Sequence, residues 1–174
     1  ITHLLDTVES AAITTRDEDQ LADRLQGLVR DNPFVAAIAV ELNGVPLAST
    51  GAISSASTAV FSRSTARGGL PSVSVIIALK PEFWGYKLAH AFSRADAKVA
   101  VYTASGRPLL PFADLDNAEN AFLAESIANM APDAAALHTQ PMRADGARSM
   151  LALQQAAAPF LAGGPMVVGT IIST

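Results

Sequence analysis

The sequence predicts an α+β fold in which antiparallel sheets form two lobes, with a long helical segment at the N-terminus. Three observations support this: apolar residues at helical spacing over residues 3–31, short alternating strands joined by glycine turns, and an internal repeat of one strand pair. The 174 residues, half of them apolar, are enough for one domain or for two small lobes that share a core. We expect the first lobe to be the reduced one, because only about 28 residues separate Asn43-Gly44 from Pro71.

The N-terminal segment is expected to be helical in two stretches. Apolar stripes with helical spacing run through residues 4–12 and 21–29, and a break separates them. Asp17 has the type of side chain that caps the N-terminus of a helix, here the second stretch. This stretch should end before Pro33, because the residue that precedes a proline avoids the helical conformation.

The first lobe is expected to consist of short antiparallel strands. Asn43-Gly44 is a strong hairpin signal, because both residue types tolerate the positive φ angles of a tight hairpin turn. The last strand alternates valine, isoleucine and leucine with smaller residues, so one of its faces should be buried. The expected strands cover residues 34–42, 45–49, 58–65 and 72–79.

The second lobe is expected to follow a connecting helix that begins with Pro81. Trp84, Leu88 and Phe92 lie four residues apart and would form the buried face of this helix. A further helix should start at residues 116–119, which resemble a capping box. The expected strands cover residues 98–103, 107–110, 137–143, 148–155 and 166–172.

One strand pair occurs twice in the sequence. Residues 40–47 (VELNGVPL) align with residues 102–109 (YTASGRPL) at an offset of 106 − 44 = 62, and Gly, Pro and Leu coincide. Both copies form a strand–turn–strand unit that follows a helix. This shared context favours a duplication, so the second lobe should repeat part of the first.

The order of these elements is that of a PAS-like sheet: helix, strand pair, helix and three closing strands. With a helix leading into residues 32–49 (NPFVAAIAVELNGVPLAS), the chain resembles the Cache sensor domains of bacterial transmembrane receptors, which open similarly and repeat the strand pair. The resemblance covers most of the chain as architecture. The pattern of the amino-acid-binding Cache domains, an Arg followed closely by Trp-Tyr with a later Tyr and Asp, is absent.

The resemblance implies a periplasmic ligand-sensing domain of an inner-membrane protein whose output is a histidine kinase, a diguanylate cyclase or a chemoreceptor. It also implies a homodimer through the N-terminal helix and transmembrane helices on both sides of the domain. The chain begins on a helical pattern and stops after a strand pattern, so we expect a domain excised from a longer protein. The expected parts are the N-terminal helical segment 1–33, the reduced, membrane-distal lobe 34–80, the connecting helix 81–97 and the second lobe 98–174.

Charge and composition argue against several other classes. The net charge of −4 and the pI of about 5.2 argue against binding to nucleic acid or to an anionic membrane surface. The mean hydropathy of +0.30 is high, yet no stretch approaches the roughly 18–20 apolar residues of a membrane span. Cysteine is absent, which removes disulfides, thiolate metal sites and cysteine nucleophiles.

No motif for catalysis, metal binding or cofactor binding occurs in the sequence. His3, His90 and His138 lie far apart and lack the spacing of metal ligands. The glycine-rich phosphate loops and the serine nucleophile elbow are also absent. We therefore expect this domain to have no enzymatic activity and no cofactor.

The expected ligand site lies on the sheet of the second lobe, which PAS-like domains use as a pocket wall. A few polar side chains on an apolar surface would orient a small molecule, here a small organic acid. An alternative anion site is formed by Arg63 and Arg67, whose planar guanidinium groups match a carboxylate or phosphate, although a solvated edge strand and turn is the favoured explanation of these two residues. The candidate ligand residues are Tyr86, Tyr102, His138, Gln140, Arg143, Arg148 and Gln154.

A second hypothesis is a scaffold or dimerisation module with the same fold. In that case Trp84, Tyr102 and Phe112 would fill the pocket, and the other polar candidates would face solvent. An enzyme is the third hypothesis, and it would require His138 within hydrogen-bonding reach of a serine and an aspartate.

Overall fold

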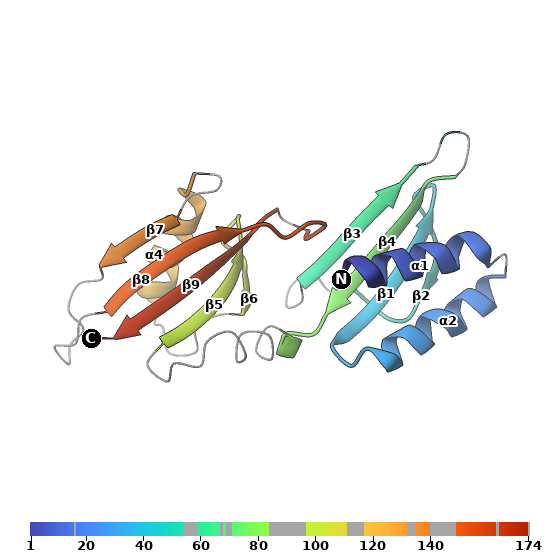
Figure 1. Cartoon of the computed structure of the whole chain (residues 1–174), viewed down its shortest axis with the longest axis horizontal. Coiled ribbons are helices and arrows are strands. Elements are labelled where there is room, and N and C mark those ends of the chain that lie inside the picture. Colours follow the sequence, from blue (N-terminus) through green and yellow to red (C-terminus); the bar gives the residue numbers. More distant parts are fainter. Residues whose placement is uncertain are drawn as a thin grey trace. The chain divides into compact units, whose positions relative to one another are not determined.

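The computed structural model describes residues 1–15, 17–53, 59–66, 68, 71–83, 97–110, 117–131, 135–139, 149–162 and 164–173. The chain divides into two compact units, Ile1–Lys80 and Pro81–Thr174 (Figure 1). Each unit is built around one antiparallel sheet, so the α+β class predicted from the sequence is confirmed. In the part of the chain that the structure describes, no helix is both long enough and apolar enough to cross a membrane.

The N-terminal segment forms two helices, α1 (Thr2–Thr14) and α2 (Glu18–Asp31). The N-terminal segment is therefore not one long helix but a pair of shorter helices, in agreement with the two helical stretches and the break predicted from the sequence. The break occurs because Asp17 adopts an extended conformation, in which its carboxylate accepts hydrogen bonds from the backbone N–H groups of Asp19 (2.9 Å) and Gln20 (3.4 Å). Asp17 is thus the N-cap of α2, as its position in the sequence predicts.

Four antiparallel strands form the sheet of the first unit: β1 (Val35–Leu42), β2 (Val45–Ser49), β3 (Ala59–Thr65) and β4 (Val73–Leu79). Their order is β2-β1-β4-β3. Asn43 and Gly44 connect β1 to β2 with φ angles of 51° and 78°, which confirms the hairpin turn.

The two helices cover one face of this sheet (Figure 1). Leu5 and Val8 of α1 and Leu21 and Leu25 of α2 are completely buried, as is Ile77 in β4. Burial of one such side chain stabilises the fold by about 1.5–3 kcal/mol. The apolar stripes of both helices therefore form the core of the first unit, together with the alternating strand.

Five antiparallel strands form the sheet of the second unit: β5 (Ala97–Thr103), β6 (Pro108–Leu110), β7 (Ala135–Thr139), β8 (Ser149–Ala156) and β9 (Met166–Ser173). Their order is β6-β5-β9-β8-β7. Helix α4 (Asn117–Ala128) contributes Leu123 and Ile127 to the buried cluster of this unit. Residues 84–96, most of the expected connecting helix, lie outside the described residues.

The two sheets share an order of connections. Each begins with a hairpin, β1–β2 or β5–β6, and the last strand of the unit, β4 or β9, pairs with the first strand of that hairpin. The glycines of the sequence repeat, Gly44 and Gly106, have φ angles of 78° and 80° in the two hairpins. The second unit adds α4 and β7 between its hairpin and its closing strands, which accounts for its larger sheet.

Candidate functional site

Tyr102, one of the predicted ligand residues, belongs to the core of the second unit. It is only 3% exposed and lies in a cluster with Leu123 and Ile127 of α4 and with Leu153 and Val167 of neighbouring strands. Its hydroxyl oxygen is also buried. The side chain therefore packs between sheet and helix, at the place where the sequence predicts a pocket wall.

Gln154 does not converge with Tyr102. The backbone of Tyr102 pairs with Val167, whereas the backbone of Gln154 pairs with the next residue, Val168. Because successive residues of a strand point to opposite faces, these two side chains lie on opposite sides of the sheet, and Gln154 is exposed.

His138 lies in β7, where its backbone pairs with Leu151. Four other predicted ligand residues lie outside the described residues: Tyr86, Gln140, Arg143 and Arg148. The site of seven residues therefore stays a prediction.

Arg63, a candidate for the alternative anion site, forms two ion pairs with helix α1. Its Nη1 atom lies 2.8 Å from Oδ1 of Asp6, and its Nη2 atom lies 2.7 Å from Oε2 of Glu9. The side chain of Glu9 is 9% exposed and that of Arg63 is 17% exposed, whereas that of Asp6 is 59% exposed. The cluster thus has a buried half and a solvated half.

The position of Arg63 follows from the strand register. It pairs with Val75 of β4, whose side chain is buried on the face that the helices cover, so Arg63 points at α1. Asp6 and Glu9 are three residues apart and therefore lie on the same side of α1. The guanidinium group binds carboxylates of its own chain here, and Arg67 lies outside the described residues, so the anion site stays a prediction.

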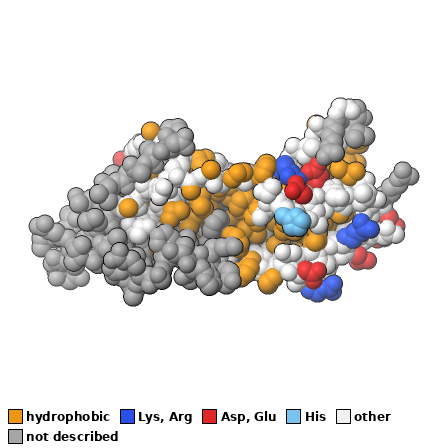
Figure 2. Space-filling model, viewed as in Figure 1, with side chains coloured by type: hydrophobic (Ala, Val, Ile, Leu, Met, Phe, Trp, Pro, Cys, Tyr) orange, Lys and Arg blue, Asp and Glu red, His pale blue; other side chains and the backbone are white. Residues whose placement is uncertain are grey.

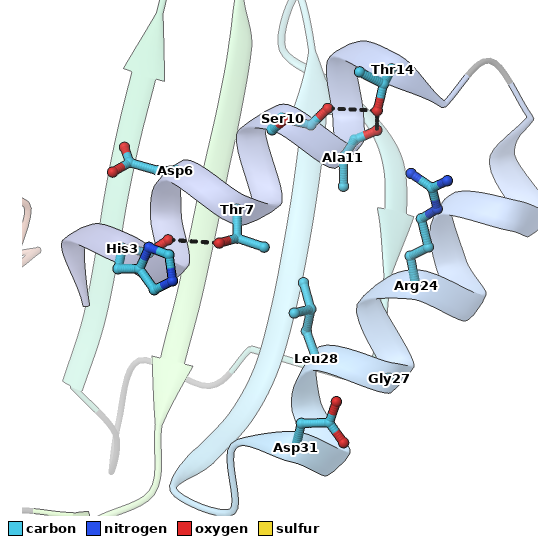
Figure 3. Close-up of a pocket in the computed structure, with 10 residues that line it drawn as sticks. All are labelled: His3, Asp6, Thr7, Ser10, Ala11, Thr14, Arg24, Gly27, Leu28 and Asp31. Carbon is cyan, nitrogen blue, oxygen red and sulfur yellow. Dashed lines mark hydrogen bonds between the residues drawn. The ribbon is translucent and has the colours of Figure 1, made fainter.

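A polar groove of about 580 Å³ runs between α1 and α2 (Figure 3). Arg24 lies beside the end of α1, whereas Asp31 lies towards the end at which α1 begins, across the groove from His3. We call this feature the α1/α2 groove. The residues that line it are His3, Asp6, Thr7, Ser10, Ala11, Thr14, Arg24, Gly27, Leu28 and Asp31.

Two of the groove hydroxyls are occupied within α1. The Oγ1 atom of Thr7 donates to the carbonyl oxygen of His3 (2.9 Å), and that of Thr14 donates to the carbonyl oxygen of Ser10 (2.8 Å). Within the described part of the chain, no hydrogen bond or ion pair engages the side chains of His3, Ser10, Arg24 and Asp31. The groove therefore presents a guanidinium, a carboxylate, an imidazole and a hydroxyl group to a ligand.

Gly27 lies in the middle of α2 and keeps the groove open. A Cβ atom added at this position would have only one neighbour within 4 Å, the Nη2 atom of Arg30 at 3.9 Å. No close contact in the described structure thus requires glycine, although glycine in a helix interior costs about 0.5–1 kcal/mol relative to alanine.

The α1/α2 groove was not predicted from the sequence. Its α2 residues Arg24, Gly27, Leu28 and Asp31 follow the spacing i, i+3, i+4, i+7, which marks one side of a helix. A glycine at the centre of such a stripe was the available signal. The lining residues of α1 follow the same helical spacing, but their side chains are mostly small and no glycine marks this stripe.

Among the described residues, neither the distribution of surface charge nor the placement of metal-ligating side chains indicates another site. Figure 2 shows basic and acidic side chains interspersed over the described surface of the first unit, with no large area of one sign in this view. Among the described residues, no group of three or more His, Asp or Glu side chains is placed to hold a metal ion.

The fold of the chain is similar to those of two solved extracellular proteins, which is consistent with the fold that the resemblance to Cache domains predicts. The extracellular domain of the proposed histidine kinase rpHK1S-Z16 has a TM-score of 0.63 and 16% identity, and the match covers 99% of this chain and 85% of that one.

An extracellular ligand binding receptor from Desulfohalobium retbaense DSM5692 has a TM-score of 0.59 and 14% identity. That match covers 98% of this chain but only 37% of the receptor. No family model matches the chain, and no curated protein matches it.

Proposed function

We propose that the chain is the ligand-sensing domain of a bacterial membrane-bound signal-transduction protein and that it acts outside the cytoplasm. The observation that carries this proposal is the likeness in fold, over 99% of the chain, to the extracellular domain of a proposed histidine kinase. The domain itself catalyses no reaction. It binds a small molecule and transmits a conformational change to an output module, which is a histidine kinase, a diguanylate cyclase or a chemoreceptor.

The proposed ligand is a small organic acid, bound at the sheet of the second unit. Arg143 and Arg148 would bind a carboxylate, because guanidinium presents a planar pair of donors to it. Tyr102 and His138 would supply further hydrogen bonds from the strands. Because Tyr102 is packed in the core, binding would displace side chains between sheet and α4, and this rearrangement is the proposed signal.

The proposed setting is a homodimer that contacts through the N-terminal helices, with transmembrane helices before and after the domain. Ligand binding can shift such a dimer between two states only by as much as the affinities for these states differ. The arrangement is supported by the fold likeness and by Ile13 of α1, a large apolar side chain that is 52% exposed.

The test is a thermal-shift screen of small organic acids with the complete chain, followed by calorimetry on each acid that stabilises it. At a concentration of about 100 times Kd, an acid that binds only the folded state adds about 2.7 kcal/mol of stability. We expect Arg143→Gln, Arg148→Gln or both to weaken binding, and Gln154→Ala to leave it unchanged. Absence of stabilisation by every acid at millimolar concentration would overturn direct sensing.

A scaffold without a ligand is the second candidate, and the tight burial of Tyr102 favours it. A scaffold would remain dimeric in multi-angle light scattering and would show no stabilisation in the screen. Its core should also tolerate Tyr102→Phe, since this change keeps the packed ring.

A further inference from the structure

We propose that the α1/α2 groove is a second binding site, independent of the sheet of the second unit, and that its ligand is a short peptide of about three residues with free termini. The groove volume of about 580 Å³ lies within the range of about 300–1,000 Å³ that is typical of small-ligand sites. The chemistry of the groove and its length together define the ligand class.

Apart from Asp6, which is paired with Arg63, the charged side chains that line the groove are Arg24 and Asp31, which have opposite signs and lie at opposite ends. Arg24 can bind a carboxylate through two parallel N–H donors, and Asp31 can accept hydrogen bonds from an ammonium group. His3 lies near the Asp31 end, and Ser10 of α1 also lines the groove (Figure 3). The hydroxyl and imidazole groups match the amides between the two termini of a peptide. A ligand with a single charge would satisfy only half of this site.

The helix sets the distance between the two charges. Arg24 and Asp31 are seven residues apart in α2, and a rise of about 1.5 Å per residue separates them by about 10 Å along the helix axis. An extended chain spans about 3.3–3.6 Å per residue, so the termini of a tripeptide are also about 10 Å apart. A single amino acid is too short to reach both groups.

The presence of glycine at position 27 supports the proposal that a ligand occupies the space between Arg24 and Asp31. It lies between Arg24 and Asp31, and the contacts of the described chain do not require a glycine there. A glycine that lowers helix stability without a structural need is explained when a ligand occupies the volume that a side chain would fill.

The dimer contact proposed for the N-terminal helices would lie outside the groove, because a second copy of the chain fits the groove itself less well than a small ligand. A symmetric contact would place one groove against the same groove of the other copy. Two concave surfaces leave a void between them, whereas an extended peptide fills one groove and satisfies the charges at both ends.

The experiment titrates the complete chain with tri-alanine, N-acetyl-tri-alanine and tri-alanine amide by calorimetry. We expect tri-alanine to bind, and each blocked peptide to bind about five- to tenfold more weakly, the size expected for one partly exposed charge pair. Arg24→Gln should abolish the preference for a free carboxylate, and Asp31→Asn should abolish the preference for a free ammonium group. Lys80→Gln is the matched control, because Lys80 is an exposed cation of the first unit that does not line the groove.

Gly27→Leu tests the site without altering a charge. The leucine should fill the groove and abolish tri-alanine binding while the circular dichroism spectrum and Tm are kept, because nothing in the described chain crowds this position. Gln26→Leu, on the neighbouring exposed position, should bind tri-alanine normally. If Gly27→Leu expresses poorly, Gly27→Ala is the second variant; it should raise Tm and still weaken tri-alanine binding, because its methyl group lies in the groove.

Several results would overturn the proposal. These are no tri-alanine binding at millimolar concentration, binding that survives Gly27→Leu, and a change in molecular mass on Gly27→Leu, which would make the groove an interface between copies. Loss of tri-alanine binding in Arg143→Gln or Arg148→Gln, with binding kept in Arg24→Gln, would place the peptide in the second unit instead. Failure of the organic-acid screen leaves the groove proposal untouched, since the two experiments use different ligands and different variants.

Discussion

Replacing Arg63, which forms ion pairs with Asp6 and Glu9, by methionine should destabilise the first unit strongly. Methionine keeps most of the volume of the arginine stem but removes the cation that faces Glu9, whose side chain is only 9% exposed. Removal of one partner of a buried ion pair costs about 3–5 kcal/mol, and we expect about 3 kcal/mol because the guanidinium itself is partly exposed.

The other members of the cluster should respond differently. Asp6→Asn should cost less than about 1 kcal/mol, because the Asp6 side chain is 59% exposed and water screens its ion pair. The double variant Arg63→Met/Glu9→Leu should recover most of the loss, since a buried ion pair can be replaced by apolar side chains at little cost.

Urea denaturation followed by circular dichroism measures these free energies, and thermal unfolding provides a second reading. For a unit of this size, about 3 kcal/mol lowers Tm by roughly 12–24 °C. The reasoning is refuted if Arg63→Met costs less than about 1 kcal/mol, or if the double variant is as unstable as Arg63→Met alone. Either result would mean that the Glu9 carboxylate is not held by Arg63.

Three turn and cap positions give further predictions for the same measurements. Asp17→Ala removes the N-cap of α2 and should cost about 1 kcal/mol, while an unchanged Tm would contradict the cap. Gly44→Ala places a side chain at a φ angle of 78° and should cost about 1 kcal/mol, with open space around the new methyl group. Gly106→Ala should cost clearly more, because its Cβ atom would lie 3.3 Å from the backbone oxygen of Ala124. Equal losses at Gly44 and Gly106 would show that the hairpin does not pack against α4 at this point.

The local elements could be predicted from the sequence because their signals lie within a few residues of each other. The Asn43-Gly44 turn, the alternation in β4 and the cap at Asp17 each depend on the conformational preference of one or two residues. The repeat also predicted correctly that a glycine hairpin would occur in both units.

The longer-range contacts could not be predicted in this way. Arg63 and Glu9 are 54 residues apart, and nothing near either residue in the sequence indicates that they meet. Their contact depends on two facts of the fold, the pairing of β3 with β4 and the position of α1 over β4. The same holds for the α1/α2 groove, because the sequence predicts two helices but not which sides of them lie together.

The candidate ligand residues show a further limit of sequence patterns. Tyr102 and Gln154 are polar residues on two strands of one sheet, β5 and β8, and nothing in the sequence indicates that their side chains lie on different faces. The strand register determines on which face of the sheet each side chain lies, since a shift of a single residue moves a side chain to the other face.

The central position of β9 sets the order in which the chain can fold during synthesis. All four strands of the first unit lie within residues 1–80, so that unit can fold while the second is still being made. The second sheet cannot be completed until residues 166–173 have been synthesised, because these residues form β9, which lies between β5 and β8. Until then β5 carries an unpaired edge, and such edges are the places where incomplete chains associate. The second unit is therefore the part whose folding should depend most on chaperones and on the rate of chain completion.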